Sequence, residues 1–381
     1  MSTKQKNNYL ILLDGTAYLY RAFHALPPLT NKKGENTGAI HGFLKALNKI
    51  LEDFSPEHIG IIFDAKGKNF RHEIFSEYKA NRSKMPDELS EQIPKLYEIL
   101  DLMGFPPIIV EGVEADDVIG SLSKKYKKSK DVKIFSGDKD FAQLVDSKVV
   151  IINPVSLEIM DQKAVKKKFG VEAKHIIDYL ALVGDKSDNI PGIPGVGAKT
   201  ASRLINQFGN VEKIISSKDL INGKVGDAIR QNIDQLNLSK ILATIKQDVN
   251  LDISLNHLIQ KKEKREELIK IYHRLELNSL LKEKKEIGNM KEEGDSLSRN
   301  INSAPINFKV VTGEKEFAKI IKDMTKEKFF AFDLETSSLN YIDAKIVGIS
   351  IALNAKSYYI PIGHSKNKKY KQLAEKFVLD N

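Results

Sequence analysis

Acidic residues follow four apolar, β-branched runs of this sequence, each at the point where the run ends. The acids are Asp14, Asp64, the trio Glu114, Asp116 and Asp117, and the pair Asp138 and Asp140. The runs that precede them lie at residues 9–13, 58–63, 107–110 and 132–135. Their composition is typical of buried strands. Because the carboxyl ends of parallel strands meet at one edge of a sheet, the sequence predicts a single site rich in carboxylates.

Two further acids, Asp185 and Asp188, stand three residues apart and can close this site from a later helical region. Carboxylates at such close quarters repel: a pair 4 Å apart costs roughly 1 kcal/mol in water and about 4 kcal/mol at an effective dielectric of 20. Cations must offset this repulsion, and an all-oxygen ligand set suits Mg²⁺ or Mn²⁺. Two such ions can bind the attacking water and the leaving oxygen of a phosphodiester.

Helix capping is the alternative explanation for single acids in this set. Asp14, Glu114 and Asp138 each precede a predicted helix and could cap it. Acids after four consecutive strands favour the metal site, because capping does not require them to share one edge of a sheet.

A cationic and aromatic segment at residues 66–84 follows Asp64 almost directly. It contains Arg71, Tyr78, Lys79 and Arg82, which are residue types that contact phosphates and stack on bases. Only eight of the 60 basic residues are Arg, so each Arg is a candidate for a planar, bidentate contact with phosphate. Arg21 lies seven residues after Asp14, about two helical turns, and can reach back toward a phosphate. A solvated charged face is the alternative, but the nearness of Asp64 favours nucleic acid.

A Gly- and Pro-rich stretch interrupts the later helical region. It nearly fits a nucleotide-binding P-loop, but Lys199 comes one residue late and no strand precedes it, so we reject that interpretation. A turn that exposes backbone N–H groups before a helix at residues 198–208 suits a DNA phosphate better. The residues predicted to bind DNA here are Gly192, Gly195, Gly197, Lys199 and Thr200. Such contacts are independent of base sequence and sensitive to salt.

The elements that must hold these residues alternate between strands and helices in the first half of the chain. This rhythm predicts an α/β fold with a parallel sheet. Residues 161–280 are predicted to be helical throughout, and residues 282–305 have the composition of a linker. The remaining elements are a fifth strand at 149–152, helices near 37–53, 87–103, 115–126 and 315–324, and late strands at 329–333, 346–353 and 357–360.

Composition narrows the class of protein further. Lys and Arg outnumber Asp and Glu by 60 to 51, which favours an anionic partner, nucleic acid first. The sequence has no Cys, which excludes disulfides, thiolate zinc sites and Cys nucleophiles. No apolar run approaches ~18 residues and the N-terminus is polar, so neither a signal peptide nor a membrane helix is expected. We predict a cytoplasmic, nucleoid-associated protein that does not bind membranes.

These motifs together resemble the flap-endonuclease family, in the form of the 5′-nuclease domains of bacterial DNA polymerase I. The matching motifs are Leu13-Asp-Gly15, Tyr18-Leu-Tyr-Arg21, Phe63-Asp-Ala-Lys-Gly67, Val113-Glu-Ala-Asp-Asp117, Gly137-Asp-Lys-Asp140 and Leu242-Ala-Thr-Ile-Lys246, with the stretches 71–82 and 184–197. They occur in consistent order through the first three quarters of the chain. The resemblance implies a PIN-like 5′-nuclease core with a parallel-dominated sheet, a helical arch over the active site, and a helix–hairpin–helix that grips duplex DNA.

The resemblance also implies a role for each residue. One metal ion would be held mainly through Asp14, Asp64, Glu114 and Asp116, with Asp117 close by, and the second would involve Asp138, Asp140, Asp185 and Asp188. Tyr78, Lys79 and Arg82 match arch residues that engage the 5′ end or the scissile phosphate. We predict Arg21, Lys79 and Arg82 to be catalytic, and Tyr78 and Arg71 to bind DNA. The hairpin of relatives also binds a monovalent cation through carbonyls, so a K⁺ site is expected there.

The last segment resembles the start of a 3′–5′ exonuclease of the DEDD type, an RNase H-like fold. Asp333 and Glu335 match the first motif of that family, in which both ligate catalytic metals. The later acidic motifs do not occur before Asn381, so we expect both acids to be catalytically idle. A polymerase domain is not expected either, which suggests a fragment of a DNA polymerase I or a reduced gene that kept only the 5′ nuclease.

The predicted domains are a catalytic core at 1–175, a helical DNA-binding region at 176–281, a linker at 282–304 and an incomplete exonuclease-like segment at 305–381. The predicted function is that of a monomeric 5′–3′ exonuclease and flap endonuclease, dependent on Mg²⁺ or Mn²⁺. It would act on DNA with 5′ flaps, nicks or RNA primers in replication and repair. The alternatives are a non-catalytic DNA-junction binder, against which the full acid set argues, and a PIN-type ribonuclease, which lacks the hairpin.

Overall fold

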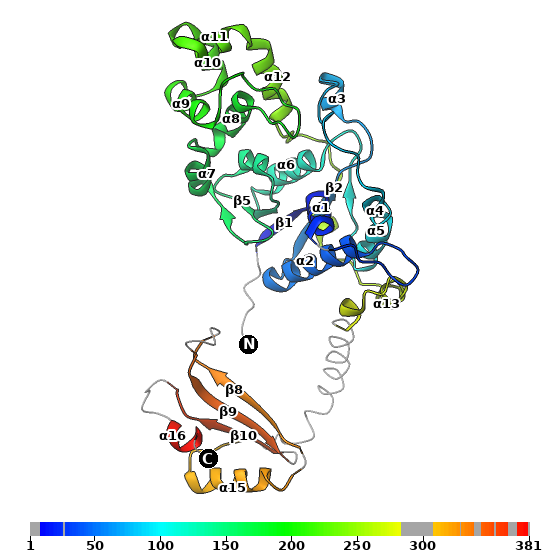
Figure 1. Cartoon of the computed structure of the whole chain (residues 1–381), viewed down its shortest axis with the longest axis vertical. Coiled ribbons are helices and arrows are strands. Elements are labelled where there is room, and N and C mark those ends of the chain that lie inside the picture. Colours follow the sequence, from blue (N-terminus) through cyan, green and yellow to red (C-terminus); the bar gives the residue numbers. More distant parts are fainter. Residues whose placement is uncertain are drawn as a thin grey trace. The chain divides into compact units, whose positions relative to one another are not determined.

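The structure is a computed structural model, and it divides into two compact units, Met1–Glu283 and Lys284–Asn381 (Figure 1). It describes residues 8–25, 27–282, 308–327, 329–338, 344–353, 356–364 and 372–379. Apart from Lys282, the predicted linker at 282–304 lies outside the described residues. In the described part of the chain, no helix is both long and apolar enough to span a membrane.

A six-stranded sheet in the order β3-β2-β1-β4-β5-β6 forms the centre of the first unit. Its strands are β1 (Tyr9–Asp14), β2 (His58–Phe63), β3 (Ile108–Ile109), β4 (Asp131–Phe135), β5 (Val149–Ile152) and β6 (Ile159–Met160). All neighbours are parallel except β5 and β6, so the expected parallel-dominated sheet is confirmed. Residues 10–13 of β1 are fully buried, as a continuous apolar run covered on both faces should be.

Helices cover both faces of this sheet and create two apolar cores. Alternate residues of β1 point to opposite faces, so Ile11 and Leu13 join one core while Leu10 and Leu12 join the other. The first core is closed by α1 (Gly15–Ala25), α2 (Gly38–Phe54), α5 (Ile93–Leu102) and α13 (Arg265–Arg274). The second is closed by α6 (Ala115–Tyr126) and by the helical region that follows the sheet.

That helical region gathers at one end of the first unit, drawn in green in Figure 1. It comprises α7 (Gln162–Phe169), α8 (Ile176–Val183), α9 (Ala198–Phe208), α10 (Val211–Ser216), α11 (Gly223–Gln231) and α12 (Ile233–Ala243). Helices α8 and α9 pack together and flank the Gly/Pro stretch, which is the expected helix–hairpin–helix arrangement. The prediction of helix throughout 161–280 is wrong at residues 244–254, which contain no helix.

The predicted helical arch takes a different local form. Residues 66–92 contain only the short helices α3 (Phe70–Ile74) and α4 (Asp87–Ser90), with consecutive turns between them. The helix expected at 87–103 is split before α5, because Pro94 lacks an N–H and favours the first turn of a new helix. The Gln92 side chain at this break accepts hydrogen bonds from the backbone N–H groups of Ala39 and Ile40.

The second unit has a four-stranded sheet in the order β7-β10-β9-β8, with a small apolar core that includes Phe317, Ile320 and Ile360. Its elements are β7 (Phe308–Val310), α15 (Glu314–Met324), β8 (Ala331–Thr336), β9 (Ile346–Leu353), β10 (Lys356–Pro361) and α16 (Glu375–Leu379). Strand β8 lies at the edge of this sheet and all six of its residues are exposed. It carries Asp333 and Glu335, whose side chains are therefore in solvent.

Candidate active site

Six of the nine predicted acids line one cavity of about 520 Å³ at the carboxyl edge of the main sheet. They are Asp14, Asp64, Glu114, Asp116, Asp138 and Asp188. Asp14 ends β1, Asp64 follows β2, and Asp138 follows β4, so parallel pairing brings them to the same edge. Lys79 and Arg82 line the same cavity. The structure therefore brings together acids and cations from distant parts of the chain. The two that are farthest apart in sequence, Asp14 and Asp188, are separated by 174 positions.

Several of these acids also accept hydrogen bonds from backbone N–H groups or from a hydroxyl group. The Asp14 carboxylate accepts from the N–H of Ala17 at 3.0 Å and from the Ser136 hydroxyl at 2.8 Å. One Asp64 oxygen accepts from the N–H of Ala115 at 2.8 Å. One Asp138 oxygen accepts from the N–H of Asp140 at 2.8 Å. Capping and a cavity-facing position are therefore compatible in these residues, not alternatives.

The carboxylates raise one another's pKa values. Burial raises the pKa of Asp14 to about 7, and the charges of Asp64 and Asp138 add to the rise. Burial, with the charges of Asp138 and Asp185, raises the pKa of Asp140 to about 8. Burial and the same kind of crowding place the pKa of Asp116 well above its ordinary value. The cavity is thus short of positive charge.

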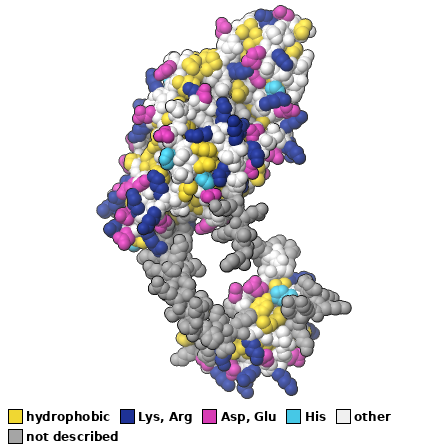
Figure 2. All heavy atoms as spheres, turned by 180° about the vertical axis from the view of Figure 1, so that it is seen from behind, with side chains coloured by type: hydrophobic (Ala, Val, Ile, Leu, Met, Phe, Trp, Pro, Cys, Tyr) yellow, Lys and Arg dark blue, Asp and Glu magenta, His cyan; other side chains and the backbone are white. Residues whose placement is uncertain are grey.

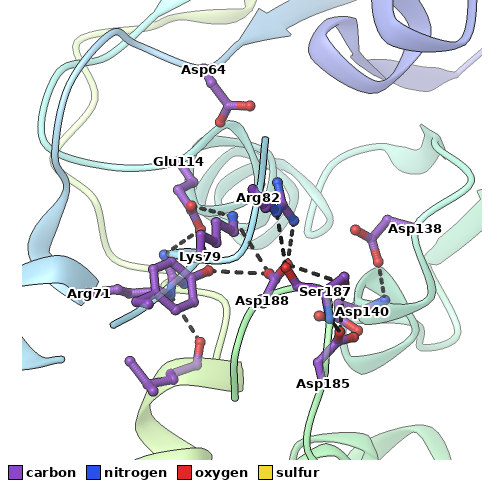
Figure 3. A network of polar contacts seen from close by, with 12 residues as sticks. Asp64, Arg71, Lys79, Arg82, Glu114, Asp138, Asp140, Asp185, Ser187 and Asp188 are labelled. Carbon is purple, nitrogen blue, oxygen red and sulfur yellow. Dashed lines mark hydrogen bonds and ion pairs between the residues drawn. The ribbon is translucent and has the colours of Figure 1, made fainter. Parts of the chain in front are cut away.

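Two cations from the turn at residues 76–82 enter the cavity (Figure 3). The Lys79 amine pairs with Glu114 and lies 3.6 Å from an oxygen of Asp188. The Arg82 guanidinium pairs with the other oxygen of Asp188. The Lys79 N–H also donates to the backbone oxygen of Asp188 at 3.0 Å, and Asn189 donates to the backbone oxygen of Glu77 at 2.7 Å. The turn is therefore docked on the loop at 184–192.

A second group of acids lies beside the cavity. Asp185 pairs with Lys139 at 2.6 Å and accepts from the N–H of Ser187. Asp140 has a buried oxygen, Oδ1, that accepts no hydrogen bond from the described residues. Together with Asp138 and Asp188, these acids form the second set that the sequence predicted, shown on the right of Figure 3.

Three residues that the sequence predicts to act at the site have buried side chains. Tyr78 is only 3 % exposed and its hydroxyl donates to Glu114 at 3.0 Å. Arg71 is 2 % exposed and pairs with Asp117, so the predicted DNA contacts of Tyr78 and Arg71 stay predictions. Asp117 is fully buried against that arginine and does not face the cavity. Sequence position alone cannot distinguish an exposed cation from one that an acid of another helix neutralises.

Arg21 does not line the cavity of the six acids. Its guanidinium lies 4.7 Å from the Tyr18 ring centre and 3.5 Å from the backbone oxygen of Pro154. Arg21 is thus directed to Tyr18 and Pro154 in this structure, and its predicted contact with a phosphate stays a prediction. A reach of two helical turns was geometrically possible, but the ring of Tyr18, one turn back on the same helix, holds the side chain instead.

Sequence reasoning overlooked three polar residues that shape the site. The Ser136 hydroxyl bridges Asp14 and the N–H of Asp138, and the Thr16 hydroxyl accepts from the N–H of Asp64 at 2.8 Å. Lys139 neutralises Asp185. Each stands within two residues of a predicted acid, and that proximity is the only signal the sequence offered.

The oxygen donors fit hard divalent cations. Among the described residues, no three carboxylate or imidazole side chains yet converge on one metal-sized position, since Lys79 and Arg82 stand between them. However, the donor set is entirely carboxylate, burial and then the charges of neighbouring acids raise the pKa values of Asp14 and Asp140, and one buried oxygen of Asp140 has no partner among the described residues. These are the properties expected of ligands for Mg²⁺ or Mn²⁺.

The hairpin residues divide into a structural part and an exposed part. Gly192 is buried: its N–H donates to the Ser239 hydroxyl at 3.0 Å and its carbonyl accepts from Gln235 at 2.7 Å. Both backbone polar groups of Gly192 are therefore engaged within the chain, and its predicted contact with DNA stays a prediction. Gly195, Gly197 and Lys199 are exposed and Thr200 is partly buried. Gly197 is the N-cap of α9 and supplies no side-chain cap, which leaves the first turn of that helix without such an acceptor.

Together, the acid-lined sheet edge and the appended helix–hairpin–helix define a nuclease. A family model described as the N-terminal resolvase-like domain of 5′-3′ exonucleases matches residues 9–170, and one described as their C-terminal SAM fold matches residues 171–267. A model described as 3′-5′ exonuclease matches residues 308–381.

Individual relatives agree with these matches. A 5′-3′ exonuclease of Aquifex aeolicus is 42% identical over 72% of this chain and 94% of its own length. DNA polymerase I of Pseudomonas aeruginosa is 42% identical over 97% of this chain, which spans 42% of that relative's length. A flap endonuclease of bacteriophage T5, solved in a pseudo-enzyme-product complex with DNA and metal ions, matches with a TM-score of 0.55 at 25% identity, over 70% of this chain and 99% of that one. The chain belongs to the 5′-3′ exonuclease family.

Proposed function

We propose that residues 1–283 form a structure-specific 5′ nuclease that depends on Mg²⁺ or Mn²⁺ and cleaves phosphodiesters at 5′ ends and flap junctions of DNA. The observation that carries this proposal is the cavity in which six acids face Lys79 and Arg82. A site that only binds DNA gains nothing from carboxylates, because they repel phosphate. Nicks and RNA primers present the same kind of 5′ junction and are included among the proposed substrates.

The metal ligands fall into two sets in this proposal. Asp14, Asp64, Glu114 and Asp116 would hold one ion, and Asp138, Asp140, Asp185 and Asp188 would hold the other. When bound, divalent ions supply the positive charge that acidifies water and offsets the charge that develops on the phosphate. We no longer include Asp117, because the oxygens of its buried carboxylate already accept from Arg71 and from two backbone N–H groups.

Lys79 and Arg82 are the proposed catalytic cations of the chain. In the structure they neutralise Glu114 and Asp188. With divalent ions bound by the acids, both side chains would be free to donate charge-assisted hydrogen bonds to phosphate oxygens. Their present contacts already hold them within reach of the cavity.

The hairpin supplies the proposed contact with duplex DNA. Gly195 and Gly197 are exposed before α9 and Lys199 is exposed in its first turn, where helix N–H groups favour a phosphate. Backbone carbonyls of the same turn are the proposed ligands of K⁺. On the face of the first unit in the upper part of Figure 2, Lys and Arg side chains are interspersed with acidic ones. DNA binding is proposed to rest on local sites such as this turn.

Asp333 and Glu335 are proposed to take no part in catalysis. Both lie on the exposed edge strand β8. Two solvated carboxylates hold a divalent ion weakly, because water competes for it from every side.

The test is a cleavage assay on a 5′-flap DNA with parallel lanes containing Mg²⁺ or EDTA. We expect products at the junction in Mg²⁺ and none in EDTA. Binding of the flap without any product in Mg²⁺ would instead support a non-catalytic junction binder. Preference for single-stranded RNA over the DNA flap would support a ribonuclease.

A further inference from the structure

Residues 242–246, which we name the strap, comprise the last two residues of α12 and the first three residues of the irregular chain that follows it. Its sequence, Leu-Ala-Thr-Ile-Lys, matched the family, yet none of its side chains lines the acid cavity. We propose that the strap, acting through Arg71 and Gln143, positions the two groups of carboxylates on either side of the cavity. This inference rests on the proposed nuclease function.

Arg71 makes the first connection, and it has no hydrogen-bonding capacity left over. Its Nη1 donates to Asp117 at 2.7 Å and to Glu114 at 3.1 Å. Its Nη2 donates to the other oxygen of Asp117 at 2.7 Å and to the strap carbonyl of Thr244 at 2.8 Å. Its Nε donates to the strap carbonyl of Leu242 at 3.1 Å. All five guanidinium N–H groups are thereby used on a side chain that is 2 % exposed.

Asp117 anchors this arginine and is equally saturated. Besides the two bonds from Arg71, one of its oxygens accepts from the N–H of Glu114 at 3.1 Å and the other from the strap N–H of Lys246 at 2.8 Å. These four bonds fill the usual capacity of a carboxylate. Asp117 therefore links the first turn of α6 to the strap, through its ion pair with Arg71 and its hydrogen bonds to backbone N–H groups.

These contacts orient the carboxylate of Glu114. One oxygen of its carboxylate, Oε2, accepts from both Arg71 and Tyr78, as the left half of Figure 3 shows for the arginine. The remaining oxygen, Oε1, is the one that meets Lys79. The buried arginine thus fixes which oxygen of Glu114 is presented to the cavity.

Gln143 makes the second connection on the opposite side of the strap. Its side-chain amide donates to the carbonyl of Ala243 at 3.0 Å and its oxygen accepts from the N–H of Ile245 at 2.9 Å. Gln143 belongs to the 3₁₀ helix η1 (Lys139–Leu144), which contains Asp140 and is capped by Asp138. The same five-residue strap therefore holds Glu114 through Arg71, and Asp138 and Asp140 through η1.

Neither Arg71 nor Gln143 lines the cavity, so both are positioning residues rather than catalytic ones. Loss of a hydrogen-bonding partner behind a metal ligand commonly reduces metal affinity or activity by about 10- to 100-fold. A DNA contact would behave differently: its loss weakens DNA binding and lowers the salt dependence of that binding.

The experiment compares Arg71→Lys with wild type in the full chain. Lysine keeps the charge but cannot fork between Asp117 and two carbonyls. At saturating flap DNA we expect kcat to fall by about 10- to 100-fold, and the Mg²⁺ concentration at half-maximal rate to rise by about tenfold. Flap affinity measured in EDTA should stay within about twofold, with an unchanged salt slope. The matched control is Arg274→Lys, which replaces a half-exposed arginine paired with Glu98 and should change none of these values.

The Gln143→Met variant tests the other end of the strap and keeps the proposal falsifiable if Arg71→Lys fails to fold. We expect the same pattern from it: lower kcat, higher Mg²⁺ demand and unchanged flap affinity in EDTA. Parallel weakening of flap affinity and salt slope would assign Arg71 to DNA contact and overturn the inference, as would wild-type kcat in Gln143→Met.

A readout without catalysis separates this inference from the proposed function. Mg²⁺ should raise the Tm of the wild type in the absence of DNA, and both variants should need about tenfold more Mg²⁺ for the same rise. Absence of cleavage by wild type with a normal Mg²⁺ response would sink the proposed function and leave the positioning role standing. Equal Mg²⁺ responses of variants and wild type would sink the positioning role.

Discussion

A single carboxylate in this cavity can serve folding and ligation together, because it has two oxygens. Asp64 uses one oxygen to accept from Ala115, and Asp138 uses one to accept from Asp140. Each leaves its second oxygen for other partners. Asp117 shows the opposite outcome, since all of its capacity is spent on Arg71 and backbone N–H groups. A carboxylate can therefore act as a ligand here only through oxygen lone pairs that accept no hydrogen bond within the folded chain.

Asp116→Asn should abolish cleavage while making the metal-free protein more stable. The pKa of Asp116 is raised by burial and by the charges of Asp138, Asp14 and Asp64, so its ionised form opposes folding at neutral pH. A neutral amide of the same shape removes that repulsion, which we estimate at about 1 kcal/mol. Cleavage rate in Mg²⁺ and Tm in EDTA measure the two effects. Cleavage close to the wild-type rate would contradict the assignment of Asp116 to the site.

The metal-free protein should lose stability as the pH rises. Asp14 and Asp140 have pKa values of about 7 and about 8 when folded, and about 4 when unfolded. Between those values the folded state binds more protons than the unfolded state, so the free energy of unfolding falls with increasing pH. We expect Tm in EDTA to be lower at pH 8.5 than at pH 5.5, and Mg²⁺ to reduce that difference. A Tm in EDTA that rises across this window would refute the crowding of these acids.

Asp116 and Asp117 are adjacent in one motif but have different surroundings, and the sequence pattern predicts this difference only in part. Asp116 and Asp117 both open α6, but successive residues of a helix point about 100° apart. One therefore lines the cavity and the other meets Arg71. The pattern predicted an acidic site at this edge. It could not predict which acid would face it, because that depends on where an arginine 46 positions away is buried.

At the scale of elements, continuous apolar strands were the most predictable feature and close backbone contacts the least. Strands β2 and β5 have the bounds that the sequence predicted, since each is an unbroken β-branched run. The two-residue strand β6 is too short to leave such a pattern. The sequence predicts helix throughout the strap, but α12 ends at Ala243, where the carbonyls of residues 242–244 accept hydrogen bonds from Arg71 and Gln143 instead of from a following helical turn. Long-range partners of this kind leave no local periodicity.

Gly192→Ala should disrupt the loop at 184–192 and so remove Asp185 and Asp188 from the site. Gly192 has φ +61°, and an added Cβ would lie 2.5 Å from the nitrogen of Gly184. We expect a loss of about 3 kcal/mol in the free energy of unfolding, together with loss of cleavage.

Gly223→Ala is the matched control for that variant. Gly223 also has positive φ, at +72°, but no described atom lies within 4 Å of an added Cβ. It should cost only about 1 kcal/mol. Thermal unfolding of the two variants separates backbone strain from collision. An unchanged Tm with weakened DNA binding in Gly192→Ala would contradict this expectation and support the prediction that Gly192 contacts DNA.

At the scale of the whole molecule, the acid cavity and the strap lie entirely within the unit Met1–Glu283. That unit has two apolar cores of its own, one on each face of the main sheet. The Aquifex aeolicus 5′-3′ exonuclease is matched over 94% of its length by 72% of this chain, so a relative without the second unit exists. The catalytic geometry should therefore not depend on residues 284–381.

A fragment of residues 1–283 should fold and cleave a 5′-flap DNA with a kcat/KM within about twofold of the full chain, because every group at the site and both cores are retained. Asp333→Ala in the full chain should likewise leave 5′ cleavage unchanged. Neither the fragment nor this variant should degrade a 3′ end. Thermal unfolding and flap cleavage of the fragment, the variant and wild type provide the comparison. If the fragment folds with a normal Tm but cleaves tenfold more slowly or worse, the second unit contributes to substrate engagement, and the nuclease cannot be treated as self-sufficient.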